Sequence, residues 1–172
     1  MLENPLLDKR LFRILAPVRT TAFILCLALI LLTSGVSAQT WYFRNYQVNN
    51  GVSSNTITSI TQDKKGFMWF GTRNGLNRFD GNTFSIFRNN IADSLSIGSN
   101  SILSLYEDDK EKLWVGTYKG IYLYDPLLES FSPFRKMAPG EIRYIKGDHL
   151  HNIWIVADFM LYEYNQPAGK VT

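Results

Sequence analysis

The sequence predicts an all-β fold made of antiparallel four-stranded blades that form part of a β-propeller. The first observation is an aspartate that stands six residues before a tryptophan three times, at Asp63/Trp69, Asp108/Trp114 and Asp148/Trp154. The second is the period, because the tryptophans are 45 and 40 residues apart, a spacing typical of repeat architectures. The third is that each copy holds short apolar runs between turn residues, and helical spacing is not sustained after residue 40.

Other positions match when the copies are aligned on their tryptophans. Isoleucine stands twelve residues before the tryptophan in all three copies, as Ile57, Ile102 and Ile142. In the first two copies a Gly-Thr pair follows the tryptophan, and another glycine stands six residues after it. These matching positions are Gly71, Thr72, Gly75, Gly116, Thr117 and Gly120.

Each copy is predicted to contain four strands. In the first copy they cover residues 57–62, 67–73, 76–79 and 83–88. The turns between them are an Asp-Lys-Lys-Gly hairpin at 63–66, a two-residue tip at 73–74 and an Asp-Gly turn at 80–81. The repeats span about 53–90, 98–136 and 138–172, and a lone strand is expected at about 41–48.

Four-stranded units with this period match the blades of a β-propeller, which has about 4–8 of them. The segment from residue 39 to 172 holds not quite three, so it predicts an incomplete ring. Each blade needs a neighbour to cover its apolar face. We therefore expect a piece of a longer protein, with an oligomer that completes the ring as the alternative.

Residues 1–38 differ from the rest. Four basic residues precede an unbroken apolar run of 11 residues, from Ala22 to Leu32, and small residues then lead to Ala38. This pattern predicts a secretory signal peptide cut after Ala38. A membrane anchor is the alternative, although the run is shorter than the roughly 20 residues that cross a bilayer. Cys26, the only cysteine, lies in this run, so the exported part would have no disulfide.

The formal net charge of the chain is +3. The first 20 residues carry four positive and two negative side chains, which leaves about +1 for the exported part. A segment with so little charge has no cationic field to attract nucleic acid or anionic lipid. We expect no contact between this segment and nucleic acid.

The repeated side chains are read as structural. The tryptophans recur inside buried strands and are expected to fill the space between blades, while each aspartate opens a hairpin and binds its own backbone. His149 and His151 share a solvent-facing hairpin with no evident third ligand, so we expect no metal site. We also expect no catalytic residue and no cofactor.

The candidate ligand-binding residues are the two-residue tips, because loops at one rim of a rigid scaffold commonly carry function. The tips differ among the copies while the strands do not. They are Arg73-Asn74, Tyr118-Lys119 and Asp158-Phe159.

Residues 62–81, which read QDKKGFMWFGTRNGLNRFDG, closely resemble the two-component regulator propeller repeat. The resemblance covers about residues 41–172 and is strong in the first two copies. In the third, Val156-Ala157 replaces Gly-Thr and Met160 replaces the glycine after the tip, which leaves the tight tip turn without its glycine.

The resemblance implies the N-terminal periplasmic sensor segment of a hybrid two-component system, in which a histidine kinase and a response regulator follow inside the cell. It implies phosphorelay signalling in response to an oligosaccharide or other small molecule, and a homodimer in the full-length receptor. No kinase motif stands in these residues, so no catalysis is expected from the chain itself. The alternatives are a fragment of a propeller-type carbohydrate-active enzyme, with Glu129, Glu141 and Glu163 as carboxylates to place, and a structural interaction propeller.

Overall fold

The computed structural model describes residues 21, 23–27 and 41–172. The chain divides into two units, Met1–Arg44 and Asn45–Thr172. In the first unit, residues 21 and 23–27 are helical and residues 41–44 have no regular secondary structure. Most of the predicted signal peptide lies outside the described residues. No helix in the described ranges has the length and hydropathy that a membrane span requires.

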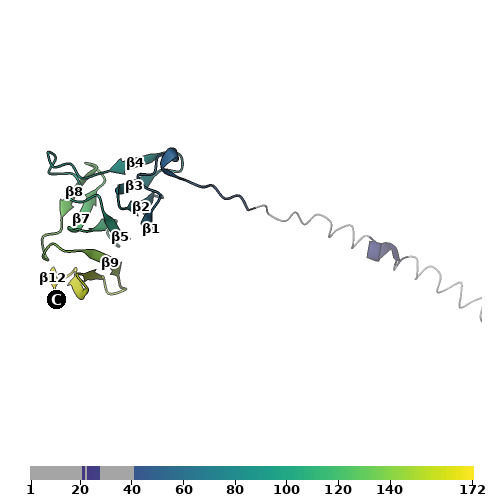
Figure 1. Cartoon of the computed structure of the whole chain (residues 1–172). Helices are drawn as coiled ribbons and strands as arrows, with labels where there is room; N and C mark the ends of the chain where they lie inside the picture. The colour runs from purple at the N-terminus through teal and green to yellow at the C-terminus, as the bar shows by residue number, and fades with distance from the viewer. Residues whose placement is uncertain (1–20, 22, 28–40) are drawn as a thin grey trace, which may run out of the picture. The chain divides into compact units, whose positions relative to one another are not determined.

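The second unit contains three four-stranded antiparallel sheets, each made of consecutive strands (Figure 1). These sheets are named blades 1, 2 and 3. Blade 1 consists of β1 (Ile57–Gln62), β2 (Met68–Thr72), β3 (Gly75–Phe79) and β4 (Phe84–Phe87). Blade 2 consists of β5 (Ile102–Glu107), β6 (Leu113–Thr117), β7 (Gly120–Asp125) and β8 (Ser130–Pro133). Blade 3 consists of β9 (Ile142–Gly147), β10 (Asn152–Ala157), β11 (Met160–Asn165) and β12 (Lys170–Val171).

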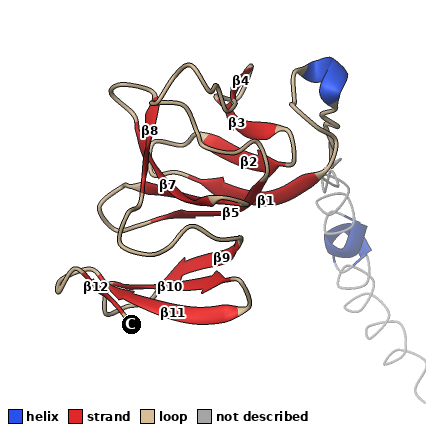
Figure 2. Cartoon of the chain, turned by 60° about the vertical axis from the view of Figure 1, so that its left-hand side comes forward, coloured by secondary structure: helices blue, strands red, loops and turns tan. Residues whose placement is uncertain are grey.

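The predicted all-β blade architecture is confirmed. In blade 1 the observed strand ends differ from the predicted ones by at most one residue. The three sheets follow one another, and their first strands β1, β5 and β9 lie side by side (Figure 2). This is the arrangement of propeller blades, in which the first strand of each sheet is the innermost.

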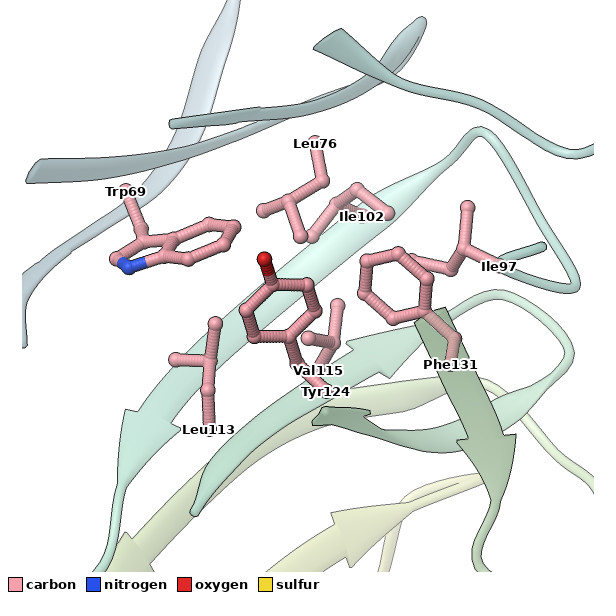
Figure 3. Close-up of a cluster of buried hydrophobic side chains, with 8 residues drawn as sticks. All are labelled: Trp69, Leu76, Ile97, Ile102, Leu113, Val115, Tyr124 and Phe131. Atoms are coloured by element: carbon pink, nitrogen blue, oxygen red, sulfur yellow. The ribbon is translucent and has the colours of Figure 1, made fainter. Parts of the chain in front are cut away.

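Apolar side chains fill the two seams, the face-to-face contacts between successive blades. In seam 1, Trp69 and Leu76 of blade 1 face side chains of blade 2 and of the connection before it (Figure 3). The ring of Trp69 meets that of Tyr124 edge-on, at 4.9 Å between centroids. In seam 2, Trp114 occupies the equivalent place against blade 3. Trp69 and Trp114 are buried and fill the space between blades, whereas Trp154 of blade 3 is only partly buried.

The two outer faces of this arc of blades are not covered. Ile102 of blade 2 is completely buried, whereas the equivalent Ile57 of blade 1 is 39% exposed. At the other end, Leu161 of blade 3 is 64% exposed, whereas its equivalent Leu76 is completely buried. The same sequence position is therefore core inside the arc and surface at its ends.

The expected lone strand at about 41–48 is not formed. Residues 41–47 have no regular secondary structure, and Val48–Asn50 forms a 3-10 turn, η1. The described sheets contain no strand from this segment, and a strand forms only where it can pair with a neighbouring strand. Tyr46 instead packs edge-on against Phe79 and Phe84 of blade 1.

Candidate ligand-binding rim

The six-residue spacing between aspartate and tryptophan is explained by a hydrogen bond. The indole Nε1 of the tryptophan donates to the aspartate Oδ2 in all three blades, at 2.8 Å for Trp69–Asp63, 2.9 Å for Trp114–Asp108 and 3.0 Å for Trp154–Asp148. The other carboxylate oxygen accepts backbone N–H groups of the same hairpin, from Phe67, Lys112 and Asn152 respectively. Each aspartate therefore closes its hairpin and also orients the indole, which in blades 1 and 2 enters a seam.

The sequence predicts the hairpin role of the aspartates but not their hydrogen bond to tryptophan. The signal was present in the fixed spacing. In blade 3 this bond has an electrostatic consequence: the pKa of Asp148 is lowered from 3.8 to about 2, chiefly because the Trp154 indole donates to the carboxylate.

The Gly-Thr pair builds the tip that follows. The Thr72 hydroxyl donates to the carbonyl of Gly75 at 2.8 Å and accepts the backbone N–H of Asn74 at 2.9 Å. Thr117 makes the same two bonds in blade 2, at 2.8 and 3.0 Å. Gly75 and Gly120 have φ values of +125° and +124°, which a residue with a side chain rarely adopts. These four residues hold the tips of blades 1 and 2 in one shape.

Blade 3 makes its tip in another way. Ala157 stands in place of the threonine and Met160 in place of the glycine, yet the turn still has two residues, because Ala157 pairs with Met160. Both Asp158 and Phe159 have positive φ, +47° and +66°. Two left-handed residues define the tight hairpin turn that normally prefers Asn-Gly. In blade 3 the residues with positive φ therefore lie within the tip, whereas in blades 1 and 2 the glycine with positive φ follows the tip.

The three tips lie at the same rim of the blades, named the tip rim. In an antiparallel sheet of four strands, the turn between the second and third strands is at the same end as the connection to the next sheet. The contacts agree, since Gly75 N donates to Asn100 O at 2.8 Å and Tyr118 N to Ser101 O at 3.1 Å. The Asp158 carboxylate likewise accepts the backbone N–H of Glu141 at 2.9 Å.

The tip backbones are thus fixed while their side chains are open. Tyr118 is 59% and Phe159 is 78% exposed, and Arg73, Asn74, Lys119 and Asp158 are exposed as well. The ring of Phe159 stacks on the guanidinium of Arg143, with 4.3 Å between Cζ and the ring centroid. Its other contacts leave most of the ring in solvent.

Two shallow cavities flank residues 136–139 on the tip rim. One, of about 290 Å³, is lined by Lys119 and Arg135 together with Tyr122 and Phe134, and no carboxylate is among its lining residues. The other, of about 310 Å³, lies toward blade 3 and includes Asp158 and Tyr162. Two of the six predicted tip residues therefore border hollows large enough for part of a small ligand.

A third cavity, of about 370 Å³, lies at the outer side of seam 1, between β4, the 88–97 connection and β8. It includes no tip residue.

The opposite rim carries the β1–β2-type hairpins and holds the blades together through polar contacts. Lys64 of blade 1 donates from its backbone N to Glu107 Oε2 at 2.9 Å and from Nζ to the Asp109 carbonyl at 2.8 Å. His151 of blade 3 contacts Asp109 Oδ2 through Nδ1 at 2.6 Å. His151 thus joins two blades, and in the part of the chain that the structure describes no group of three potential metal ligands is found.

Arg78 is a seam residue that the sequence does not single out. It donates to the Tyr124 hydroxyl at 2.9 Å and to Glu129 at 2.7 Å, and its guanidinium lies 5.1 Å from the ring centroid of Phe67. The equivalents of Arg78 in the other copies are Leu123 and Glu163. No repetition marked this position, so only the three-dimensional contacts reveal its role.

The three glutamates weighed for glycoside chemistry do not lie at one place. Glu129 is the last residue of the β7–β8 turn and binds Arg78. Glu141 precedes β9 at the tip rim and pairs with Arg143 at 3.0 Å. Glu163 lies within β11. Glu129 and Glu141 therefore stand at opposite ends of the sheets.

The architecture defines this segment as consecutive blades of a β-propeller. A family profile described as "Two component regulator propeller" matches residues 51–74 and 96–119. These ranges are offset by 45 residues, the distance from Trp69 to Trp114. These two stretches of the chain therefore match the repeat of the two-component regulator propeller family.

Known proteins with similar sequence or structure point the same way. Over 55 residues the chain is 51% identical to Histidine kinase P4 of Formosa agariphila, a match that covers 32% of this chain and 4% of that protein. The extracellular domain of the hybrid two-component system BT3049 from B. thetaiotaomicron is 28% identical with a TM-score of 0.67, over 75% of this chain and 19% of that domain. The extracellular domain of BT4673 from the same organism, described as a one-component system, is 25% identical with a TM-score of 0.58, over 72% and 17%. The chain spans less than a fifth of each of these proteins.

Proposed function

We propose that this chain is a ligand-sensing propeller segment of the receptor of a bacterial two-component signal-transduction system, exposed on the periplasmic side of the inner membrane. The observation that carries the proposal is the tip rim. Its backbone is fixed by hydrogen bonds to the inter-blade connections, while Tyr118 and Phe159 present exposed rings that differ from blade to blade. A rigid scaffold with variable, open tips is how a propeller presents a binding surface. The similarity to extracellular domains of two-component systems supports the receptor role.

An oligosaccharide is the proposed ligand, and the six tip residues Arg73, Asn74, Tyr118, Lys119, Asp158 and Phe159 are its proposed contacts. Exposed aromatic rings offer flat apolar faces to sugar rings, with polar groups beside them for the hydroxyls. The cavity lined by Lys119 and Arg135 without a carboxylate favours an acidic sugar at that place.

In the full-length receptor, the uncovered faces of blades 1 and 3 are proposed to contact further blades. Signalling is proposed to occur in a homodimer: ligand binding biases an equilibrium between two arrangements, and the kinase modules respond to it. The signal peptide over residues 1–38 is proposed to be removed after Ala38. The chain itself is proposed to have no catalytic activity.

Calorimetry of the full-length gene product against neutral and acidic oligosaccharides tests this function. Lys119→Ala should weaken binding of an acidic oligosaccharide by about tenfold, the equivalent of one lost charged hydrogen bond. Lys65→Ala, on the opposite rim, is the matched control and should leave binding unchanged. No heat of binding across the panel, or equal effects of the two variants, would contradict the proposal. Turnover of the same sugars would favour the enzyme alternative instead.

A further inference from the structure

The seams between blades rest on a close contact between a glycine and an isoleucine. Gly71 on β2 is paired with Ser59 on β1. A Cβ added at Gly71 would collide with the Ser59 hydroxyl and would lie 2.8 Å from Cγ2 of Ile102, the first residue of the next blade. Gly71 and Ser59 thus form a socket that admits the side chain of Ile102, which is completely buried.

Seam 2 repeats this arrangement. Gly116 on β6 is paired with Ser104 on β5. A Cβ at Gly116 would collide with the Ser104 hydroxyl and lie 2.8 Å from Cγ2 of Ile142, which is also completely buried. The isoleucine that recurs twelve residues before each tryptophan is therefore the projecting side chain, and the glycine-serine pair of the preceding blade is its socket.

Blade 3 has no such socket on its outward face. The pair at the equivalent place is Val156 on β10 and Tyr144 on β9, which are directly opposite each other. Two large side chains stand where blades 1 and 2 have a glycine and a serine. An isoleucine presented in the geometry of Ile102 or Ile142 would meet the side chain of Val156, because even a single Cβ at that place comes within 2.8 Å of it in both existing seams.

The same face is nevertheless built to be covered. Leu161 is 64% exposed there, and Tyr144 is 53% exposed, whereas Leu76 and Ile121, the equivalents of Leu161, are 0% and 3% exposed. Trp154 is only half-buried, whereas Trp69 and Trp114 are buried in the seams. A patch of this composition on a sheet face indicates an interface.

We propose that the outward face of blade 3 is an interface for a further blade whose innermost strand carries glycine, alanine or serine where β5 and β9 carry Ile102 and Ile142. The proposal rests on the proposed function in one respect, namely that the chain is part of a larger propeller. It follows from the likeness of this face to the faces in seams 1 and 2. In those seams the next blade covers the face, and a side chain at the socket position would exclude the isoleucine of that blade. The small residue leaves room for Val156 and Tyr144. In this seam the large side chains would belong to blade 3 and the small one to the next blade, the reverse of seams 1 and 2.

In blade 3, Val156 and Tyr144 occupy the place of the socket, and this filled socket also disfavours docking of a second copy of the chain. Blade 1 of a second copy would present Ile57, which is 39% exposed, to the face of blade 3. In the geometry of seams 1 and 2, Ile57 would meet Val156. Head-to-tail contacts between copies form open fibres or unintended rings, and a steric mismatch is an effective way to prevent them.

The steric rule can be tested in seam 1, where both sides are present in the chain. The double substitution Ser59→Tyr and Gly71→Val gives blade 1 the face of blade 3. With Ile102 retained, the urea midpoint of the full chain should fall. Adding Ile102→Ala should raise the midpoint in this background, although Ile102→Ala alone lowers it in the wild type. If Ile102→Ala lowers the midpoint by the same amount in both backgrounds, the proposal is overturned.

A milder background guards against a double variant that does not fold. Gly71→Ala places only a Cβ in the socket, and the loss from Gly71→Ala and Ile102→Ala together should then be smaller than the sum of the single losses. Strict additivity here also overturns the proposal. Neither measurement involves a ligand, so a failure of oligosaccharide sensing and a failure of this seam rule remain distinguishable.

A separate experiment tests whether Val156 and Tyr144 prevent a second copy of the chain from docking on blade 3. Tyr144→Ser with Val156→Gly opens the socket and should produce a rise in mass with concentration in sedimentation experiments, relative to the wild type. Adding Ile57→Ser should abolish the rise. A double variant whose mass matches the wild type at every concentration would overturn the claim that the filled socket excludes a second copy.

Discussion

Removal of the Asp108 carboxylate should destabilise the protein far more than removal of the carboxylate next to it. Asp108 is 5% exposed and accepts hydrogen bonds from the Trp114 indole at 2.9 Å, from the backbone N–H groups of Lys110 and Lys112 at 2.9 Å each, and from Gln166 at 3.1 Å. In Asp108→Ala the indole N–H stays buried without its acceptor, which costs about 1–3 kcal/mol. The two backbone donors are nearer to solvent and add about 1 kcal/mol together. The expected loss is therefore about 2–4 kcal/mol.

Asp109→Ala is the matched control. Its carboxylate is 66% exposed and pairs with His151, which is 62% exposed, so its removal should cost about 0–1 kcal/mol. Urea unfolding of the full chain, followed by tryptophan fluorescence and by circular dichroism, gives both values. If the two variants lose stability equally, the aspartate–tryptophan bond is not what holds the hairpin and indole in place.

Two further predictions concern the exposed face of blade 3 and the loss of stability at low pH. Leu161→Ser should lower the free energy of unfolding by less than about 0.5 kcal/mol, and Leu76→Ser by about 3 kcal/mol, because Leu161 is exposed and Leu76 is completely buried. Equal losses in urea unfolding would show that the blade 3 face is covered within this chain. The pKa of Asp148 is lowered from 3.8 to about 2, so its stabilising contribution is complete above pH 3.8 and is lost as the pH falls through about 2. The stability difference between wild type and Asp148→Asn should shrink across that window, and a difference independent of pH would contradict the hydrogen bond from Trp154.

The repeated features of the fold could be predicted from the sequence because repetition makes a weak local signal visible several times. The strands of blade 1, the hairpins at the aspartates and the burial of Trp69 all follow from positions that recur. The same alignment located the tips at corresponding turns. It could not show which tip side chains border a cavity, since that depends on the 136–139 connection, which has no fixed place in the repeat.

What could not be predicted lies at positions that occur once. Arg78 bridges two blades, but its equivalents are not arginine, so the sequence gives no reason to single it out. The tip of blade 3 keeps its length through two left-handed residues, Asp158 and Phe159, although the usual glycine is missing. A lone strand is expected at about 41–48, but a strand also needs an edge to pair with, and pairing is not a property of the segment alone.

The central claim is that the recurring tryptophans are fixed structural elements of the seams and not part of a ligand-binding surface. Hydrogen exchange of the four indole N–H groups, measured by NMR on the full chain, tests it most directly. Trp69 and Trp114 are buried and bonded to aspartate, so their indole protons should exchange slowly, and the indole of Trp154 at an intermediate rate. The indole of Trp41, which is 81% exposed, should exchange fastest. Exchange at Trp69 and Trp114 as fast as at Trp41 would contradict the account.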